Sequence, residues 1–319
     1  MLEEKILEFL KRKPNYVSGD QISHSLGVSR QALWKHIQEL RDTGYHIVAV
    51  PHLGYKLVSS PDRLFPLEIS QHLNSKFMGK KIYYFDAVSS TMDIATGLGI
   101  KGSPEGTIVV AETQTKGRGR MARCWFSPKY KGIYLSIILR PDILPNSTPL
   151  LTLLCAVSIL EAIKSQIGLD TKIKWPNDLL IHNKKVGGIL TELNAEMDIT
   201  HFVVIGIGLN VNNDKKSLVE GATSLKEEAK EEVGRLSLIQ DILRSIETNY
   251  IIFQQKGGQH IIEKWRLNSA TLGKRIKVNY QKTHLEGQAI DIDTDGGLLV
   301  RCDSGLIEKI MAADIVHCR

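Results

Sequence analysis

Few cysteines and no long apolar segment occur in this sequence, and both absences exclude classes of protein. The uncharged apolar segment Pro149 to Leu160 is shorter than the roughly 20 apolar residues that a membrane span requires. Acidic residues open the chain and no apolar segment follows them, so we expect a cytoplasmic protein with no membrane partner. No C-x-x-C pair occurs, so we expect reduced thiols rather than disulfides or a zinc ribbon at Cys124, Cys155, Cys302 and Cys318.

Internal repeats and a Walker-type phosphate loop are also absent, which excludes solenoids, propellers and P-loop sites. The composition, 42% hydrophobic and 24% charged, is that of a folded globular protein. Because single cores stop growing near about 250 to 300 residues, a chain of 319 residues predicts more than one domain. The net charge of +6 permits anionic partners such as nucleic acid or nucleotides and does not choose between them.

The predicted secondary structure changes in character twice along the chain. We predict domains at residues 1–63, 64–270 and 271–319, the first ending at the breakers Ser59 to Asp62. The middle part is predicted to be mixed α/β, with strands at Lys81–Val88, Thr107–Ala111, Ile133–Leu139 and His201–Ile207 and helices at Leu150–Ile167 and Leu236–Phe253. The last part predicts a small β barrel, with strands at Arg275–Tyr280, Leu285–Asp291, Leu298–Cys302 and Gly305–Ile310.

The first part has the pattern of a winged helix-turn-helix. Ser18 and Ser29 are placed to cap two short helices that are separated by a glycine turn. The second of these helices has an apolar side at Leu33, Ile37 and Leu40. A hairpin over residues 46–58 follows and would form the wing.

The polar face of that helix suggests DNA binding. Groups of three short helices also occur as scaffolds that bind no DNA. The first 60 residues carry an excess of only two basic residues over acidic residues, which is weak support for DNA binding. The placement of the polar side chains at the start of the helix favours contact with bases and phosphates, and the predicted contacts are Ser29, Arg30, Gln31, Lys35 and Gln38. We expect Trp34 to be a partly buried core aromatic.

A loop rich in glycine and arginine, Thr113 to Trp125, follows a predicted buried strand. Lys116, Arg118, Arg120 and Arg123 place four cations within eight residues, and glycines at 117 and 119 let backbone amides approach a ligand. This density suits a polyphosphate, although a flexible surface loop or a nucleic-acid patch has the same composition. The tryptophan that ends the loop is expected either to stack on an adenine or to join the core.

Two further segments interrupt strand patterns in ways typical of a site. Lys174 to Asp178 inserts a proline, a cation and a carboxylate after a strand, and a hairpin follows whose returning strand begins at Lys185 before two glycines. Lys185 can therefore lie against a ligand, although a lysine at a strand start is usually solvated. Gly206 to Asn210 places two glycines and an amide at the end of another strand, where Asn210 could contact an adenine edge.

Taken in order, these motifs resemble the bifunctional biotin protein ligases that are also biotin operon repressors, with an N-terminal DNA-binding domain. The resemblance spans nearly the whole chain and implies an α/β (α+β) multidomain fold: a winged helix-turn-helix, a central ligase domain of the biotin/lipoate type and an SH3-like β barrel. It implies ATP and biotin as substrates, with Mg²⁺, and transfer of biotin to a lysine of a biotin carboxyl carrier protein such as that of acetyl-CoA carboxylase. It also implies binding to operator DNA of biotin genes by a homodimer of the adenylate-bound form.

The resemblance also implies roles for individual residues. Biotin is expected to contact Ser90, Thr91, Met92, Gln114, Arg118, Gly119, Arg120 and Lys185. ATP is expected to contact Arg118, Arg120, Arg123, Trp125, Lys185 and Asn210, and the catalytic groups are Lys185, Arg118 and Arg120. Asp178 is a candidate ligand of the metal ion.

The sequence departs from the family at two places and leaves two alternatives open. Met92 stands where many members have asparagine, and Met121-Ala122 replaces the residue and glycine found in some relatives after G-R-G-R. A lipoate-type ligase would use similar chemistry on a longer acyl chain, but such families usually lack the winged helix. A non-catalytic, biotin-sensing DNA-binding regulator is the other alternative, against which Lys185 and Gln114 argue.

Overall fold

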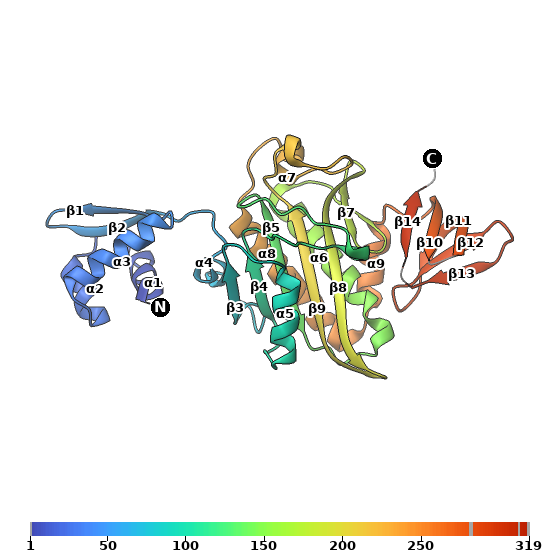
Figure 1. Ribbon diagram of the computed structural model, residues 1–319, viewed down its shortest axis with the longest axis horizontal. Helices are drawn as coiled ribbons and strands as arrows, with labels where there is room; N and C mark the ends of the chain where they lie inside the picture. The colour runs from blue at the N-terminus through green and yellow to red at the C-terminus, as the bar shows by residue number, and fades with distance from the viewer. Residues whose placement is uncertain (1, 281–282, 312, 318–319) are drawn as a thin grey trace. The chain divides into compact units, whose positions relative to one another are not determined.

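A computed structural model describes residues 2–280, 283–311 and 313–317 of the chain (Figure 1). The backbone divides into two compact units, Met1–Arg63 and Leu64–Arg319. Of the four cysteines, Cys318 lies outside the described residues, and Cys124, Cys155 and Cys302 are free thiols. Burial raises the pKa of the Cys155 thiol to about 12, so this side chain is an inert part of the core.

The first unit is a winged helix-turn-helix. Its elements are α1 Leu2–Lys11, α2 Gly19–Leu26, α3 Arg30–Asp42, β1 His46–Val50 and β2 Gly54–Ser59. Ser18 Oγ accepts the amide of Gln21 at 3.1 Å, and Ser29 Oγ accepts that of Ala32 at 3.1 Å, so both predicted caps begin their helices. Gly27, at φ 67°, makes the left-handed turn between the two helices.

Trp34 corrects one prediction for this unit. Its side chain is 57% exposed and therefore does not belong to the core, where we expected it. Leu33, Ile37 and Leu40 fill the buried stripe of α3, and residue 34 lies about a quarter turn away from that stripe. The helical period therefore places the ring outside the core in spite of its apolar character.

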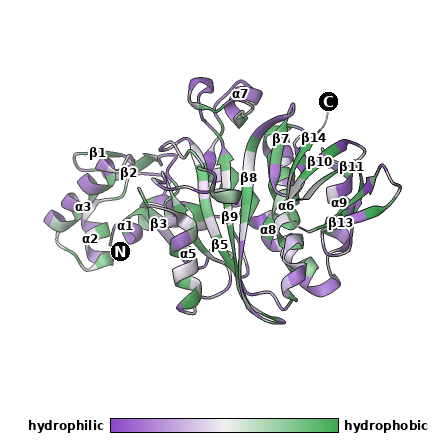
Figure 2. Cartoon of the chain, turned by 45° about the vertical axis from the view of Figure 1, so that its right-hand side comes forward, coloured by the Kyte–Doolittle hydropathy of each residue, from purple (hydrophilic) through white to green (hydrophobic). Residues whose placement is uncertain are grey.

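The second unit is built on a seven-stranded sheet in the order β3-β4-β5-β9-β8-β7-β6. The β3 and β4 strands are parallel, and the remaining neighbours are antiparallel. The strands are β3 Ile82–Phe85, β4 Thr107–Ala111, β5 Gly132–Leu139, β6 Lys172–Lys174, β7 Asp178–Ile181, β8 Lys184–Glu196 and β9 Ile199–Asn210. Figure 2 shows hydrophobic residues along the central strands.

Helices cover both faces of this sheet. The α-helices are α4 Pro66–Ser70, α5 Thr91–Ile100, α6 Pro149–Ile167, α7 Leu225–Ala229, α8 Arg235–Lys256 and α9 Gln259–Leu267. Short 3₁₀ turns occur at Arg120–Ala122, Pro145–Ser147 and Lys215–Ser217. Neighbouring strand residues point to opposite faces, so Ile108 and Val110 join the larger core with α6, α8 and α9, whereas Val109 packs with Met92 and Ala95 of α5.

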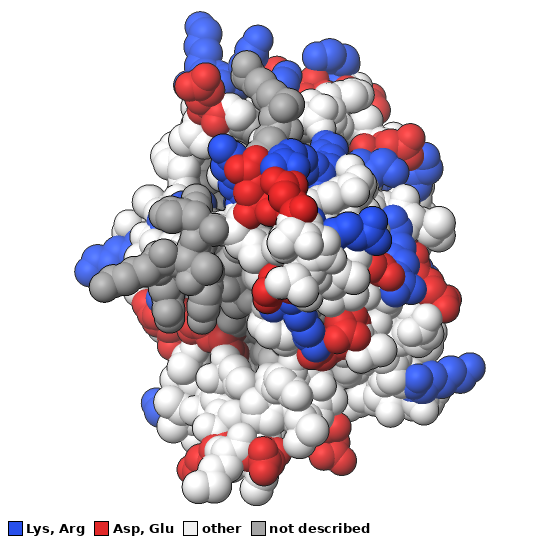
Figure 3. All heavy atoms as spheres, turned by 90° about the vertical axis from the view of Figure 1, so that its right-hand side faces the viewer, with Lys and Arg blue, Asp and Glu red and all other residues white. Residues whose placement is uncertain are grey.

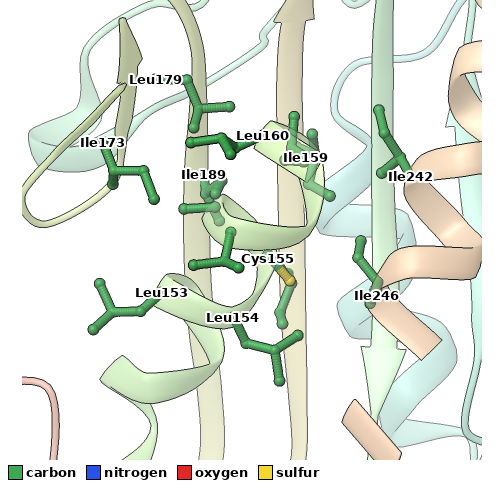
Figure 4. Packing of buried hydrophobic residues seen from close by; sticks show 14 of the residues in the cluster. Leu153, Leu154, Cys155, Ile159, Leu160, Ile173, Leu179, Ile189, Ile242 and Ile246 are labelled. Atoms are coloured by element: carbon green, nitrogen blue, oxygen red, sulfur yellow. The ribbon is translucent and has the colours of Figure 1, made fainter. Parts of the chain in front are cut away.

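The α6 helix forms the centre of the larger core. The segment Pro145–Ile167 is long and apolar enough to cross a membrane, but 61% of its apolar window is buried inside the unit. Figure 4 shows α6 side chains such as Leu154 and Ile159 packed close to Ile189 on one side and Ile242 on the other. Its all-round hydrophobicity is therefore that of a core helix.

A buried ion pair fixes the point where the chain enters this unit. Arg235 Nη1 lies 2.7 Å from Glu112 Oε2, and both side chains are completely buried. The other oxygen, Glu112 Oε1, accepts the amide of Leu64 at 2.9 Å. Glu112 follows β4 directly, so the first residue of the unit is held by the sheet itself.

The last part of the second unit is a five-stranded antiparallel sheet in the order β13-β12-β11-β10-β14. Its strands are β10 Arg275–Tyr280, β11 Thr283–Ile292, β12 Leu298–Cys302, β13 Ile307–Ile310 and β14 Asp314–His317. Trp175, between β6 and β7, is buried and donates its indole N–H to the carbonyl of Gly296 at 3.1 Å. Figure 3 shows basic and acidic side chains interspersed over this side of the molecule, rather than a surface of one sign.

The predicted fold class is confirmed, and several elements differ from the prediction in detail. The predicted strand at Lys81–Val88 is shorter in the structure, and β14 and the α5 and α9 helices were not predicted. Thr91–Ile100 contains two glycines and β-branched residues, which lower its intrinsic helix propensity. Packing against β4, β5 and β9 therefore determines that this segment is helical.

Candidate active site

One cavity brings together the ligand-contacting residues that were predicted from several distant segments. Its lining includes Ser90, Thr91, Met92, Gln114, Arg118, Gly119, Arg120, Arg123, Trp125, Asp178, Lys185 and Asn210. The residues come from the start of α5, the Thr113–Trp125 loop, the β7–β8 hairpin and the end of β9. Lys185, Arg118 and Gln114 therefore share a single pocket although up to 71 positions separate them.

Hydrogen bonds fix the polar end of this cavity. Gln114 Oε1 accepts from the amide of Thr91 at 2.8 Å and from its hydroxyl at 3.1 Å. Gln114 Nε2 donates to Ser127 Oγ at 3.2 Å, and the buried Ser136 hydroxyl donates to Thr91 Oγ1 at 2.9 Å. A set of donors and acceptors held in this way can orient a polar ligand group without first reorganising. Ser136 was not predicted, because its only sequence signal is a hydroxyl within an apolar strand.

Arg118 is held between two carboxylates. Its guanidinium donates to Glu192 at 3.0 and 3.2 Å and also contacts Asp93. Burial opposes its charge, but the hydrogen bonds to Asp93 and Glu192 outweigh this effect and raise the pKa of Arg118. Neither carboxylate was predicted, because the residues lie 25 and 74 positions away and meet Arg118 only through the fold.

Lys185 lies at the other wall of the cavity. Its Nζ is 2.5 Å from Asp178 Oδ1 and 5.5 Å from the centre of the Trp125 ring. The backbone is fixed on both sides, because Lys185 N donates to Gly221 O and Thr223 N donates to Lys185 O, each at 2.8 Å. The ammonium group therefore points into the cavity between a carboxylate and an aromatic face.

The glycines of β8 and β9 make room for side chains that line the cavity. A Cβ atom at Gly208 would come within 2.5 Å of the Trp125 ring, and one at Gly206 within 2.6 Å of Met92 Sδ. The strand glycines therefore admit Trp125 and Met92, which in turn form the wall of the pocket. Met92 itself is 3% exposed and packs with the α5 side of the sheet.

Trp125 and Asn210 form the remaining predicted wall. The indole Nε1 of Trp125 is buried and finds no acceptor among the residues that the structure describes. Asn210 Nδ2 donates to the carbonyl of Thr223 at 3.1 Å. A loop that was not predicted, which includes Leu218, Val219 and Ala222, also lines the cavity near them.

The arginine loop also reaches the C-terminal sheet. Arg120 Nη1 donates to the carbonyl of Ala313 at 3.2 Å, immediately before β14. Met121 and Ala122 in this loop have positive φ angles of 54° and 55°. The backbone shape that favours glycine is therefore adopted here by two other residues.

The predicted DNA-contacting residues lie on α3 of the first unit. Ser29 caps the helix, and Gln31 and Lys35 are exposed, whereas Gln38 is half-buried. The guanidinium of Arg30 is paired with Asp20 of α2, which raises the pKa of Arg30 through the hydrogen bonds and charge of that carboxylate. Lys35 Nζ lies 3.9 Å from Glu39 Oε1 on the next turn.

The cavity as a whole suits a ligand with a polar head and negative charge. Arg118, Arg120, Arg123 and Lys185 supply positive charge around it, and Thr91 and Gln114 supply directed hydrogen bonds. Such an arrangement stabilises anions that are brought close together and negative charge that develops between them.

Family models match three successive parts of the chain. The biotin/lipoate A/B protein ligase family matches residues 84–210, a helix-turn-helix domain matches residues 3–56, and the biotin protein ligase C terminal domain matches residues 271–318. The bifunctional ligase/repressor BirA of Bacillus subtilis (strain 168) is 42% identical over 319 residues, which is 98% of each chain. The bifunctional ligase/repressor BirA of Escherichia coli (strain K12) is 31% identical over 93% of this chain and 92% of its own.

A solved structure shares the architecture of the second unit. The biotin protein ligase from Aquifex aeolicus in complex with biotin and ATP is 28% identical, with a TM-score of 0.66. It is matched over its whole length and covers 75% of this chain.

Proposed function

Since this chain belongs to the biotin/lipoate A/B protein ligase family, we propose that it activates biotin with ATP, transfers biotin to a carrier protein and represses transcription. The full-length similarity to bifunctional ligase/repressors supports both activities, and the helix-turn-helix unit supports the second. The observation that carries the ligase assignment is the cavity shared by Gln114, Arg118 and Lys185. Biotin and ATP are its substrates.

The first half-reaction joins two anions. A carboxylate oxygen of biotin attacks the α-phosphorus of ATP, and the bond from that phosphorus to the bridging oxygen of the β-phosphate breaks. The products are biotinoyl-5'-AMP and pyrophosphate. Lys185 stands where its ammonium can exchange Asp178 for the biotin carboxylate and the α-phosphate, and it stabilises the charge that builds at phosphorus.

The second half-reaction requires no nucleophile from this chain. The ε-amine of a carrier lysine attacks the acyl carbon of the mixed anhydride, AMP leaves, and the nitrogen loses a proton. In our assignment Ser90, Thr91, Met92 and Gln114 hold the biotin head, with the Arg118–Gly119–Arg120 stretch covering it. Arg123, Trp125 and Asn210 contact the nucleotide, and the indole N–H of Trp125, which has no acceptor among the described residues, is a donor for it.

A magnesium ion fits the cavity at one position. Asp178 is the one carboxylate among the described residues that line it, and Mg²⁺ is commonly held by one or two carboxylates together with substrate phosphates. When bound, the ion would neutralise the leaving pyrophosphate. Asp178 would hold it, and Lys185 would then be released toward the reacting groups.

The partners follow from the two activities. The acceptor is a biotin carboxyl carrier protein, of acetyl-CoA carboxylase or another biotin-dependent enzyme, and the DNA partner is the operator of biotin genes. We assign the operator-bound state to a homodimer of the adenylate-bound chain, and we place the protein in the cytoplasm. The boundaries of the three functional parts are proposed to be residues 1–63, 64–270 and 271–319.

One assay separates this function from its alternatives. The chain is incubated with ATP, an apo carrier domain and either radiolabelled biotin or radiolabelled lipoate. We expect label from biotin on the carrier. Label from lipoate instead would assign a lipoate-type ligase, whereas biotin that binds without ever reaching the carrier would assign a non-catalytic regulator.

A further inference from the structure

Trp34 lies exposed on the same helix as the predicted DNA contacts. Its side chain is 57% exposed on α3. Residues three and four positions apart are neighbours on a helix, so Arg30, Gln31 and Gln38 lie one turn before or after it. A large apolar ring therefore stands within the polar surface that was assigned to DNA.

A single exposed apolar residue is ordinary, so the exposure of Trp34 has meaning only through its surroundings. The basic side chains beside Trp34 are partly neutralised by carboxylates of the same unit, since Arg30 is paired with Asp20 and Lys35 lies 3.9 Å from Glu39. Charge also attracts DNA without regard to sequence. The charges of the helix are therefore partly offset within the unit, and the indole is its large exposed apolar group.

The wing also carries an exposed apolar side chain. Leu53, in the turn between β1 and β2, is 54% exposed. The recognition helix and the wing are the two parts that a winged helix presents to DNA, and each carries an exposed apolar side chain. In the major groove, the apolar feature that distinguishes one base from another is the 5-methyl group of thymine.

We propose that Trp34 is a base-reading residue that packs against a thymine 5-methyl group in the major groove. The inference rests on the proposed repressor function and names the chemistry by which it selects a sequence. Removing the methyl group leaves base pairing and the phosphates unchanged, so the contact can be tested on the DNA as well as on the protein.

The test uses the full-length chain with biotin and ATP. Duplexes are first selected from a random pool by the wild-type protein, and each thymine of the selected site is then replaced by uracil. The thymines are replaced one at a time, and at fixed salt we expect a single uracil at the contacted position to weaken wild-type binding about fourfold, the effect of losing one buried methyl group. Trp34→Ala should bind the thymine duplex more weakly than wild type and should bind both duplexes equally.

Two control variants make the outcome specific. Gln31→Ala, on the same face, should weaken binding to both duplexes and keep the fourfold ratio, and Trp34→Phe should keep most of it. Because the ring is exposed, thermal unfolding of Trp34→Ala should match that of the wild type. A ratio that survives in Trp34→Ala, or a selected site without any methyl sensitivity, overturns the inference alone. A wild-type chain that selects no duplex overturns the repressor function and this inference together.

Discussion

Lys185 and Arg118 are both cations in the cavity, but their surroundings give them different freedom. Arg118 is bound by Glu192 and Asp93 together, whereas Lys185 shares one carboxylate, Asp178. A group with one such contact can transfer to a ligand more easily than a group with two. Lys185 is therefore the cation best suited to follow charge as it develops during adenylation.

We expect Lys185→Ala to slow formation of biotinoyl-AMP by about a hundred- to a thousandfold, as for the loss of other preorganised charge-stabilising groups. The measurement is pyrophosphate release in a single turnover. The matched control is Lys184→Ala, which removes the exposed neighbouring lysine outside the cavity lining and should leave the rate unchanged. Equal rates in the wild type and Lys185→Ala would refute the assignment.

Side chains that break a local pattern can be recognised from the sequence. Lys185 before two glycines and the cations around Gly117 are visible in the sequence, and the structure places Lys185, Arg118 and Gln114 on one cavity. Their partners are not visible in this way. Glu192 lies within a long strand, and only the register of β8 in the sheet brings it to Arg118.

Helix α3 has a buried apolar stripe and an exposed face whose basic side chains lie close to carboxylates of the same unit. The predicted caps and the period of Leu33, Ile37 and Leu40 were sufficient to locate this helix. The pairing of Arg30 with Asp20 was not predictable, because it depends on the angle between α2 and α3. The exposure of Trp34 could have been predicted from the same period, since residue 34 falls outside the buried stripe.

We expect Arg30→Ala combined with Lys35→Ala to weaken operator binding at least about tenfold and to lower its salt dependence, because two phosphate- or base-contacting cations are removed. Ligation should be unaffected, since both residues lie outside the ligase unit. Operator titration and carrier labelling are measured on the same preparation. Parallel loss of both activities would contradict this separation.

The β14 strand brings a histidine against the segment that follows the ligase sheet. His317 Nε2 lies 3.4 Å from Thr271 Oγ1, whose oxygen also accepts the amide of Trp175 at 3.0 Å. Burial, followed by the charges of Lys174 and Lys274, lowers the pKa of His317 to about 4. In the unfolded chain a histidine titrates near 6.5, so the unfolded state takes up this proton first.

This difference predicts the direction of a pH effect. The stabilisation is fully present above about pH 6.5 and is lost as the pH falls toward 4, because protonation then favours the unfolded state. We expect the melting temperature of the wild type to fall more between pH 6.5 and 4.5 than that of His317→Gln. Identical slopes in the two proteins would exclude His317 as the source.

The chain forms two compact units, and we expect each to carry one of the two activities. The first unit, Met1–Arg63, has its own buried residues, among them Ile6, Ile22 and Ile37. The C-terminal sheet differs, because Ile276, Val300 and other side chains join the same hydrophobic core as α6 and α8. Composition and turn signals indicated a change at residue 271 but could not show that the two sides share one core.

We expect a chain lacking residues 1–63 to remain folded and to label the carrier at a rate within about twofold of the full chain, because the core of the second unit is retained. It should no longer bind the operator. Thermal unfolding and carrier labelling are the measurements. A truncated protein that is unfolded would show that the units are not separable.

Glu112 fixes the position at which the chain enters the second unit. Through Leu64 it holds the residue at which the chain leaves the DNA-binding unit, and it stands two positions before Gln114, which faces the ligand cavity. The residues just after β4 therefore hold two segments that are far apart in the sequence, the first residue of the second unit and a side chain that lines the cavity. We expect a shift of Glu112 to displace both.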